Sequence, residues 1–178
     1  MSSQGGSSVT LNLEIGRRST DLVLRATGAV DEHFSLQMGL DTLWPPAPPG
    51  HGPSAWAIEH AIQVVEDQIA TMHHRVPVGA QLRMPGSAVA LLRREGTIPV
   101  PNHEAISLAM VEQWYQALAA RAEGAPSARG TGFDEPSGDA LMLILRELMH
   151  HLGFDALHIE DEPAGATGGT GVTKTSSA

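Results

Sequence analysis

Histidine and carboxylate side chains are the residues of this sequence best suited to chemistry. The chain has nine histidines and no cysteine, so imidazole and carboxylate are the metal ligands that remain. Glu147 precedes His150 by three positions and His151 by four, and residues at these spacings share one face of a helix. Zn, Fe, Mn and Ni accept this combination of ligands. We therefore name Glu147, His150 and His151 as candidate metal ligands, with a divalent metal ion as the candidate for an otherwise unknown cofactor.

The same residues also allow a purely structural interpretation. A histidine in the last turn of a helix interacts favourably with the helix macrodipole, which would account for His150 and His151. A di-iron helix bundle needs two Glu-x-x-His motifs and two further glutamates, whereas the sequence has one clear example, Glu147 with His150. On the sequence alone, both interpretations stay open.

Two polar stripes follow the predicted first helix. They recur every seven residues and consist of Glu59, Glu66 and His73 and, beside them, His60, Asp67 and His74. Both stripes lie opposite the apolar seam of that helix, and a helix surface opposite such a seam is normally solvated. We interpret them as a solvated face and not as metal ligands.

Established catalytic motifs are missing from the sequence. It contains no Gly-x-Ser-x-Gly elbow, no phosphate-binding glycine-rich loop that ends in lysine, and no dinucleotide-binding fingerprint. The zinc-protease pattern His-Glu-x-x-His is absent as well. Because no complete catalytic set can be assembled from these motifs, the sequence favours a protein that is not an enzyme.

The composition excludes several classes of partner and location. A formal net charge of −9 at pH 7 argues against nucleic acid, because phosphate contacts need clustered Lys and Arg. Residues 1–8 lack the apolar segment of a signal peptide. No apolar run approaches the roughly 20 residues that span a bilayer. We expect a cytoplasmic protein without membrane insertion.

Alternating apolar residues predict three strands near the N-terminus. Val9, Leu11, Leu13 and Ile15 occupy alternate positions, which is the period of a half-buried strand. Further strands are expected over residues 21–26 and 34–40, and three short strands in succession indicate an antiparallel meander.

Three helices with capping residues are predicted after the meander. Their expected limits are an N-cap at Ser54 with an end near His74, an N-cap at Asn102 with an end near Ala122, and an N-cap at Ser137 with an end at Gly153. Short strands are expected at 81–84 and 154–159, and the segment 86–96 fits either a helix or a strand. The predicted fold class is α+β: an N-terminal antiparallel β-meander followed by about three helices and a short C-terminal strand.

The predicted organisation is one domain between two disordered ends. Residues 9–162 form the single α+β domain, and the polar segments 1–8 and 163–178 form a disordered leader and tail. Within the domain, 44–53 is a proline-rich connector and 123–136 a mobile loop.

Two functions are compatible with these features. The favoured one is a non-catalytic accessory or adaptor protein that binds a partner protein in the assembly or maturation of a larger complex, with Trp44 and Trp114 as partner-binding residues. The absence of a complete catalytic set and the low charge density favour this function, and self-association stays open. The alternative is a metal-dependent enzyme or a metal-handling protein that uses the His and Glu ligands.

Overall fold

The computed structural model describes residues 9–45, 52–86, 105–125 and 136–160. Its elements in chain order are β1 (Val9–Ile15), β2 (Thr20–Ala26), β3 (Glu32–Leu36), α1 (Ala55–Ala70), η1 (His73–Arg75), β4 (Gln81–Pro85), β5 (Ile106–Ser107), α3 (Leu108–Ala122), α4 (Pro136–Leu152) and β6 (Ala156–Glu160). The predicted leader 1–8 and tail 163–178 lie outside the described residues. So do most of the segment 86–96, the proline-rich part of the connector and most of the loop 123–136.

The N-terminal meander is present as predicted. β1 pairs antiparallel with β2, and β2 pairs antiparallel with β3. Alternate side chains of β1 and β2, including Leu11, Leu13 and Leu22, are buried on one face of the sheet. The third strand is shorter than expected, because β3 ends at Leu36 although Met38 is also buried.

The meander forms half of a six-stranded mixed sheet with the strand order β3-β2-β1-β4-β6-β5. β4 runs parallel to β1 on one side and parallel to β6 on the other, and β5 closes the sheet in an antiparallel direction. A parallel neighbour requires a crossover connection, which α1 supplies between the meander and β4. The predicted α+β class is therefore confirmed.

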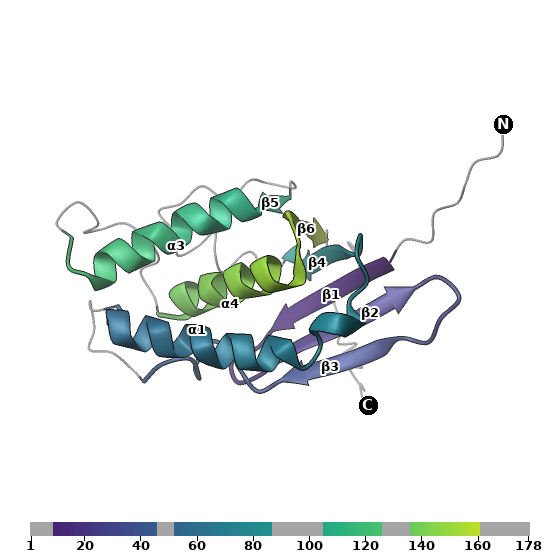
Figure 1. Ribbon diagram of the computed structural model, residues 1–178, viewed down its shortest axis with the longest axis horizontal. Helices are drawn as coiled ribbons and strands as arrows, with labels where there is room; N and C mark the ends of the chain where they lie inside the picture. Colours follow the sequence, from purple (N-terminus) through teal and green to yellow (C-terminus); the bar gives the residue numbers. More distant parts are fainter. Residues whose placement is uncertain (1–8, 46–51, 87–104, 126–135, 161–178) are drawn as a thin grey trace, which may run out of the picture.

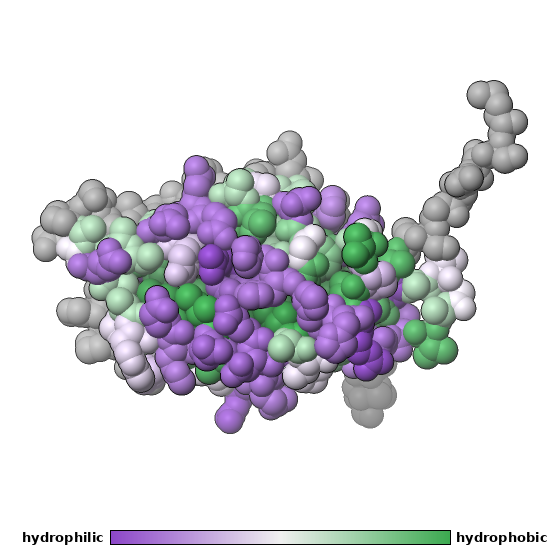
Figure 2. Space-filling model, viewed as in Figure 1, coloured by the Kyte–Doolittle hydropathy of each residue, from purple (hydrophilic) through white to green (hydrophobic). Residues whose placement is uncertain are grey.

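The three helices lie on the same side of this sheet, with α4 between α1 and α3 (Figure 1). Their inward side chains and the inner face of the sheet form one apolar core. Trp44 and Trp114 both belong to this core and are buried, so these indoles have a packing role. The opposite surface of the helices is mostly hydrophilic, with smaller apolar areas between the polar side chains (Figure 2). No helix among the described segments is long and apolar enough to cross a membrane.

The first helix begins as predicted but ends earlier. The Ser54 side chain accepts a hydrogen bond from the Ala57 backbone N–H at 3.2 Å, which caps α1. The α-helix ends at Ala70 and not near His74, because the chain tightens into the short 3-10 turn η1.

The second helix begins later than predicted. Ile106 and Ser107 pair with β6 as strand β5, so the helix can begin only at Leu108. Ser107 then acts as the N-cap, with its hydroxyl accepting from the Met110 N–H at 3.2 Å. The expected cap, Asn102, lies outside the described residues.

The third helix begins at Pro136, so Ser137 lies within it and does not precede it. Proline suits the first position of a helix because that position needs no N–H donor. The predicted end is confirmed. Gly153 has a left-handed φ of 73°, and the following Phe154 N–H bonds to the Met149 carbonyl at 2.8 Å.

Candidate metal centre

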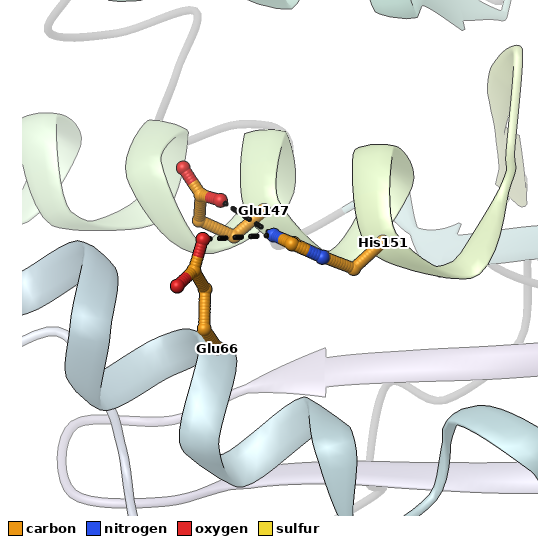
Figure 3. A group of neighbouring side chains, drawn as sticks. All are labelled: Glu66, Glu147 and His151. Carbon is orange, nitrogen blue, oxygen red and sulfur yellow. Dashed lines mark hydrogen bonds and ion pairs between the residues drawn. The ribbon is translucent and has the colours of Figure 1, made fainter.

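Two helices bring the candidate site together. Glu147 and His151 lie four residues apart on α4, and this spacing directs both side chains to the face that packs against α1. Glu66 lies on α1 and points to the same place from the opposite side (Figure 3). One carboxylate oxygen from each glutamate and one ring nitrogen of His151 all lie within 4.8 Å of one another.

The imidazole of His151 lies between the two carboxylates. Its Nε2 is 3.2 Å from Glu66 Oε1 and 3.3 Å from Glu147 Oε2. The Glu147 side chain is 0% exposed, whereas those of His151 and Glu66 are 35% and 38% exposed. The site is thus anchored on a buried carboxylate and reaches solvent through its other two members.

Arg146 compensates part of the buried charge of Glu147. Its Nη1 donates to Glu147 Oε1 at 2.5 Å, and its Nε donates to Glu112 Oε1 on α3 at 3.1 Å. The guanidinium carbon also lies 4.4 Å from the centre of the Tyr115 ring. Burial alone would lower the pKa of Arg146, but the hydrogen bonds and negative charges of Glu147 and Glu112 outweigh it and raise the pKa. Arg146 is therefore a fixed positive charge between α3 and α4.

The second oxygen of Glu147 has no such donor. Oε2 is buried and accepts no hydrogen bond from the residues that the structure describes, although His151 Nε2 lies within ion-pair distance of it, at 3.3 Å. A ring nitrogen carries at most one hydrogen, and Nε2 forms its hydrogen-bond contact with Glu66. A buried carboxylate oxygen without a donor is costly. This orphaned oxygen faces the point between Glu66 and His151, where a cation would satisfy it.

Two separations among the three ligand atoms are close to those around a tetrahedral metal ion. Metal–ligand bonds of about 2.0–2.2 Å put neighbouring ligand atoms about 2.8–3.1 Å apart in an octahedral sphere and about 3.3–3.6 Å apart in a tetrahedral one. The two separations from Nε2, 3.2 and 3.3 Å, lie close to the lower end of the tetrahedral range. One imidazole with two carboxylates is a ligand set that suits Zn, Mn and Fe.

The sequence predicted two of these three residues. Glu147 and His151 come together, whereas His150 is exposed and its ring meets the His151 ring edge to face, with centroids 5.3 Å apart. Glu66 belongs to a stripe that we interpreted as a solvated face; its side chain is 38% exposed and also contacts His151 of α4. Nothing in the sequence indicates that α1 packs against α4, so the contact could not be foreseen.

The remaining members of the two stripes stay at the surface. His60 and His73 are exposed, and His60 stacks on the exposed ring of Trp56 with centroids 5.6 Å apart. Asp67 is exposed and accepts from the Gln63 amide on the same helix. None of these residues joins the metal-ligand group.

No family model and no curated protein match this sequence. Solved structures do match its fold. The Aquifex aeolicus PPX-GPPA enzyme superposes with a TM-score of 0.59 at 14% identity, covering 89% of this chain and 55% of the solved chain. An exopolyphosphatase from Cytophaga hutchinsonii gives 0.52 at 13% identity, with 88% and 54% covered. An exopolyphosphatase-like protein gives 0.58 at 14% identity, with 87% and 55% covered.

At these identities the likeness establishes the fold, and the chain spans about half the length of the solved structures. The finding corrects the favoured functional prediction. A non-catalytic accessory protein for complex assembly is wrong, because this is the fold of solved Ppx/GppA phosphatases. The alternative prediction, a metal-dependent enzyme with His and Glu ligands, agrees better with both the fold and the Glu66–Glu147–His151 group.

Proposed function

We propose that this chain is a metal-dependent enzyme domain that binds a divalent transition-metal ion through Glu66, Glu147 and His151. The observation that carries the proposal is the orphaned oxygen of Glu147, a buried carboxylate atom that faces two further ligands. Three protein ligands leave at least one coordination position for water or substrate, which is the arrangement of catalytic rather than structural zinc sites. The exposure of His151 and Glu66 gives that position access to solvent.

The fold supports a reaction class for this site. Proteins with the same fold are named as phosphatases and exopolyphosphatases. We propose hydrolysis of a phosphate ester or anhydride, in which water adds to phosphorus, the bridging P–O bond breaks and the leaving oxygen takes up a proton. A bound divalent ion would polarise a phosphoryl oxygen and lower the pKa of bound water.

Metal binding is tested on the full chain purified without a histidine tag. Zn²⁺ titration by calorimetry should give one site per chain, and both His151→Ala and Glu147→Gln should abolish it. His150→Ala is the matched control, because it removes the neighbouring imidazole and should leave binding intact. Equal Zn²⁺ binding by the wild type and by the Glu147→Gln, His151→Ala double variant would refute the site.

The reaction class needs its own measurement. Phosphate release from polyphosphate should require Zn²⁺ or Mn²⁺, stop with EDTA and fall in His151→Ala but not in His150→Ala. Metal-independent release, or release that His151→Ala leaves unchanged, would separate the activity from this site. Stoichiometric metal binding with no release would contradict the reaction class and leave the metal site standing.

A further inference from the structure

The two oxygens of Glu147 have different surroundings. Oε1 accepts from Arg146 Nη1 at 2.5 Å, while Oε2 is the orphaned atom that faces the candidate metal position. Arg146 is itself held on its other side by Glu112 of α3 at 3.1 Å and lies over the ring of Tyr115. With a side chain only 20% exposed and contacts on both sides, Arg146 has little freedom to leave Oε1.

We infer that Arg146 is a positioning residue that determines which metal ions the site accepts, an inference that rests on the proposed metal site. Because its guanidinium occupies Oε1, Glu147 can offer only Oε2 and binds an ion through one oxygen. Arg146 thereby makes the site a small set of three single-atom ligands: one nitrogen and two oxygens.

This restriction distinguishes between classes of cation. Ca²⁺ takes six to eight oxygen ligands at longer distances and commonly uses both oxygens of a carboxylate. Zn²⁺ is satisfied by about four ligands and accepts imidazole readily. A buried glutamate with one oxygen blocked therefore disfavours Ca²⁺ much more than Zn²⁺. The fork geometry of a guanidinium matters here, since lysine offers a compact point charge without the rigid planar fork that meets Glu112 and Glu147.

The test compares the affinities of Zn²⁺ and Ca²⁺ in the full chain. The measured quantity is the ratio of the Ca²⁺ Kd to the Zn²⁺ Kd, because a change in charge or a general loosening of the helices affects two divalent ions alike. Arg146→Met keeps an apolar side chain over the Tyr115 ring and removes every donor. Since outer-shell partners of metal ligands commonly change affinity about 10–100-fold, we expect the ratio to fall by about tenfold or more.

Two further variants and a control complete the design. Arg146→Lys should lower the ratio by less than Arg146→Met does. Glu112→Gln, which weakens the anchor of Arg146 on α3, should lower it in the same direction and serves as the test if circular dichroism shows that Arg146→Met does not fold. Arg25→Met, which breaks the exposed pair with Asp31 in the β2–β3 hairpin, should leave the ratio unchanged.

Each outcome decides between the two proposals. A lower ratio in Arg146→Met or Glu112→Gln supports the positioning role. An unchanged ratio, including equal weakening of both ions, would overturn it while leaving the metal site intact. Absence of Zn²⁺ binding in the wild type would overturn the metal site itself and the inference with it.

Discussion

The two halves of α4 differ in the side chains that they place around the core, because the second half adds polar groups to the buried Leu148 and Met149. From Ala140 to Leu145 every residue is apolar and at most 1% exposed. The next turns carry Arg146, Glu147 and His151, and Glu147 is just as inaccessible. Burial of the first half follows from packing between the sheet and two helices, whereas burial of a carboxylate is unfavourable unless charged partners compensate it. The difference shows that one helix can serve both as core and as support for a site.

The largest effect is expected in the apolar half. Leu145→Ala should lower the free energy of unfolding by about 2–5 kcal/mol, because it leaves a cavity in a fully buried position. Chemical denaturation measures this loss. At temperatures where the variant is folded, its Zn²⁺ Kd should stay close to that of the wild type. A much larger Zn²⁺ Kd would mean that packing in the apolar half of α4 also determines metal binding in the polar half.

Metal that binds at the polar half of α4 should stabilise the whole folded chain. Zn²⁺ at a hundred times its Kd should raise the free energy of unfolding by about 2.7 kcal/mol, since the ion binds the folded chain. Thermal denaturation with and without Zn²⁺ measures the effect. Leu145→Ala should gain as much as the wild type, and His151→Ala should gain nothing. A gain that persists in His151→Ala would place the ion elsewhere.

Glu147→Gln should destabilise the metal-free protein by a smaller amount. The amide keeps an acceptor for Arg146 but loses the charge, so we expect a loss of about 1–3 kcal/mol in chemical denaturation. Glu66→Gln, at a half-exposed position, is the matched comparison and should cost less. Equal costs at the two positions would contradict the distinction between a buried and a peripheral ligand.

Tyr115, beside the polar half, should make stability depend on alkaline pH. Burial is the main cause that raises its pKa above 10.0, and the negative charges of Glu59, Glu147 and Glu112 add to the shift while Arg146 opposes it. The folded protein therefore holds the phenol proton more tightly than the unfolded chain does. Stability should fall as the pH rises above about 10 towards the raised pKa. Tyr115→Phe should reduce this slope, and an unchanged slope would contradict the assignment.

His150→Ala should have the smallest effect. Its side chain is exposed, and surface substitutions usually change stability by at most about 0.5 kcal/mol. Thermal denaturation and Zn²⁺ binding should both match the wild type. A loss of Zn²⁺ binding would show that His150 is a metal ligand. It would contradict the distinction between the solvated and the buried side of this helical turn.

Local patterns in the sequence predict the fold class because each rests on near neighbours. Alternation predicts the meander, Ser54 predicts the start of α1, and Gly153 predicts the end of α4, and all three are confirmed. The predictions of element boundaries fail where contacts between residues distant in the sequence determine the structure. Ile106 continues a helical pattern, yet its pairing with Leu157 on β6 makes it a strand residue.

The residues of the candidate site likewise differ in whether the sequence can predict them. Glu147 and His151 are predictable because a four-residue spacing is a property of one helix. Glu66 is not, because its role depends on where α1 lies against α4. Nor does the sequence distinguish His150 from His151, since the burial of either depends on which face of α4 meets its neighbours.

The strand order has a consequence for how the chain folds. β4 lies in the middle of the sheet between β1 and β6, and Thr10 pairs with Gln81 across a long stretch of sequence. The hairpins of the meander can form as soon as they are synthesised, whereas the centre of the sheet waits for contacts between distant segments, which slow folding. Of the described elements, β6 is the last to be made. Until it arrives, one edge of β4 is unpaired and can pair with another chain, so the nascent protein is most prone to aggregate just before synthesis of β6.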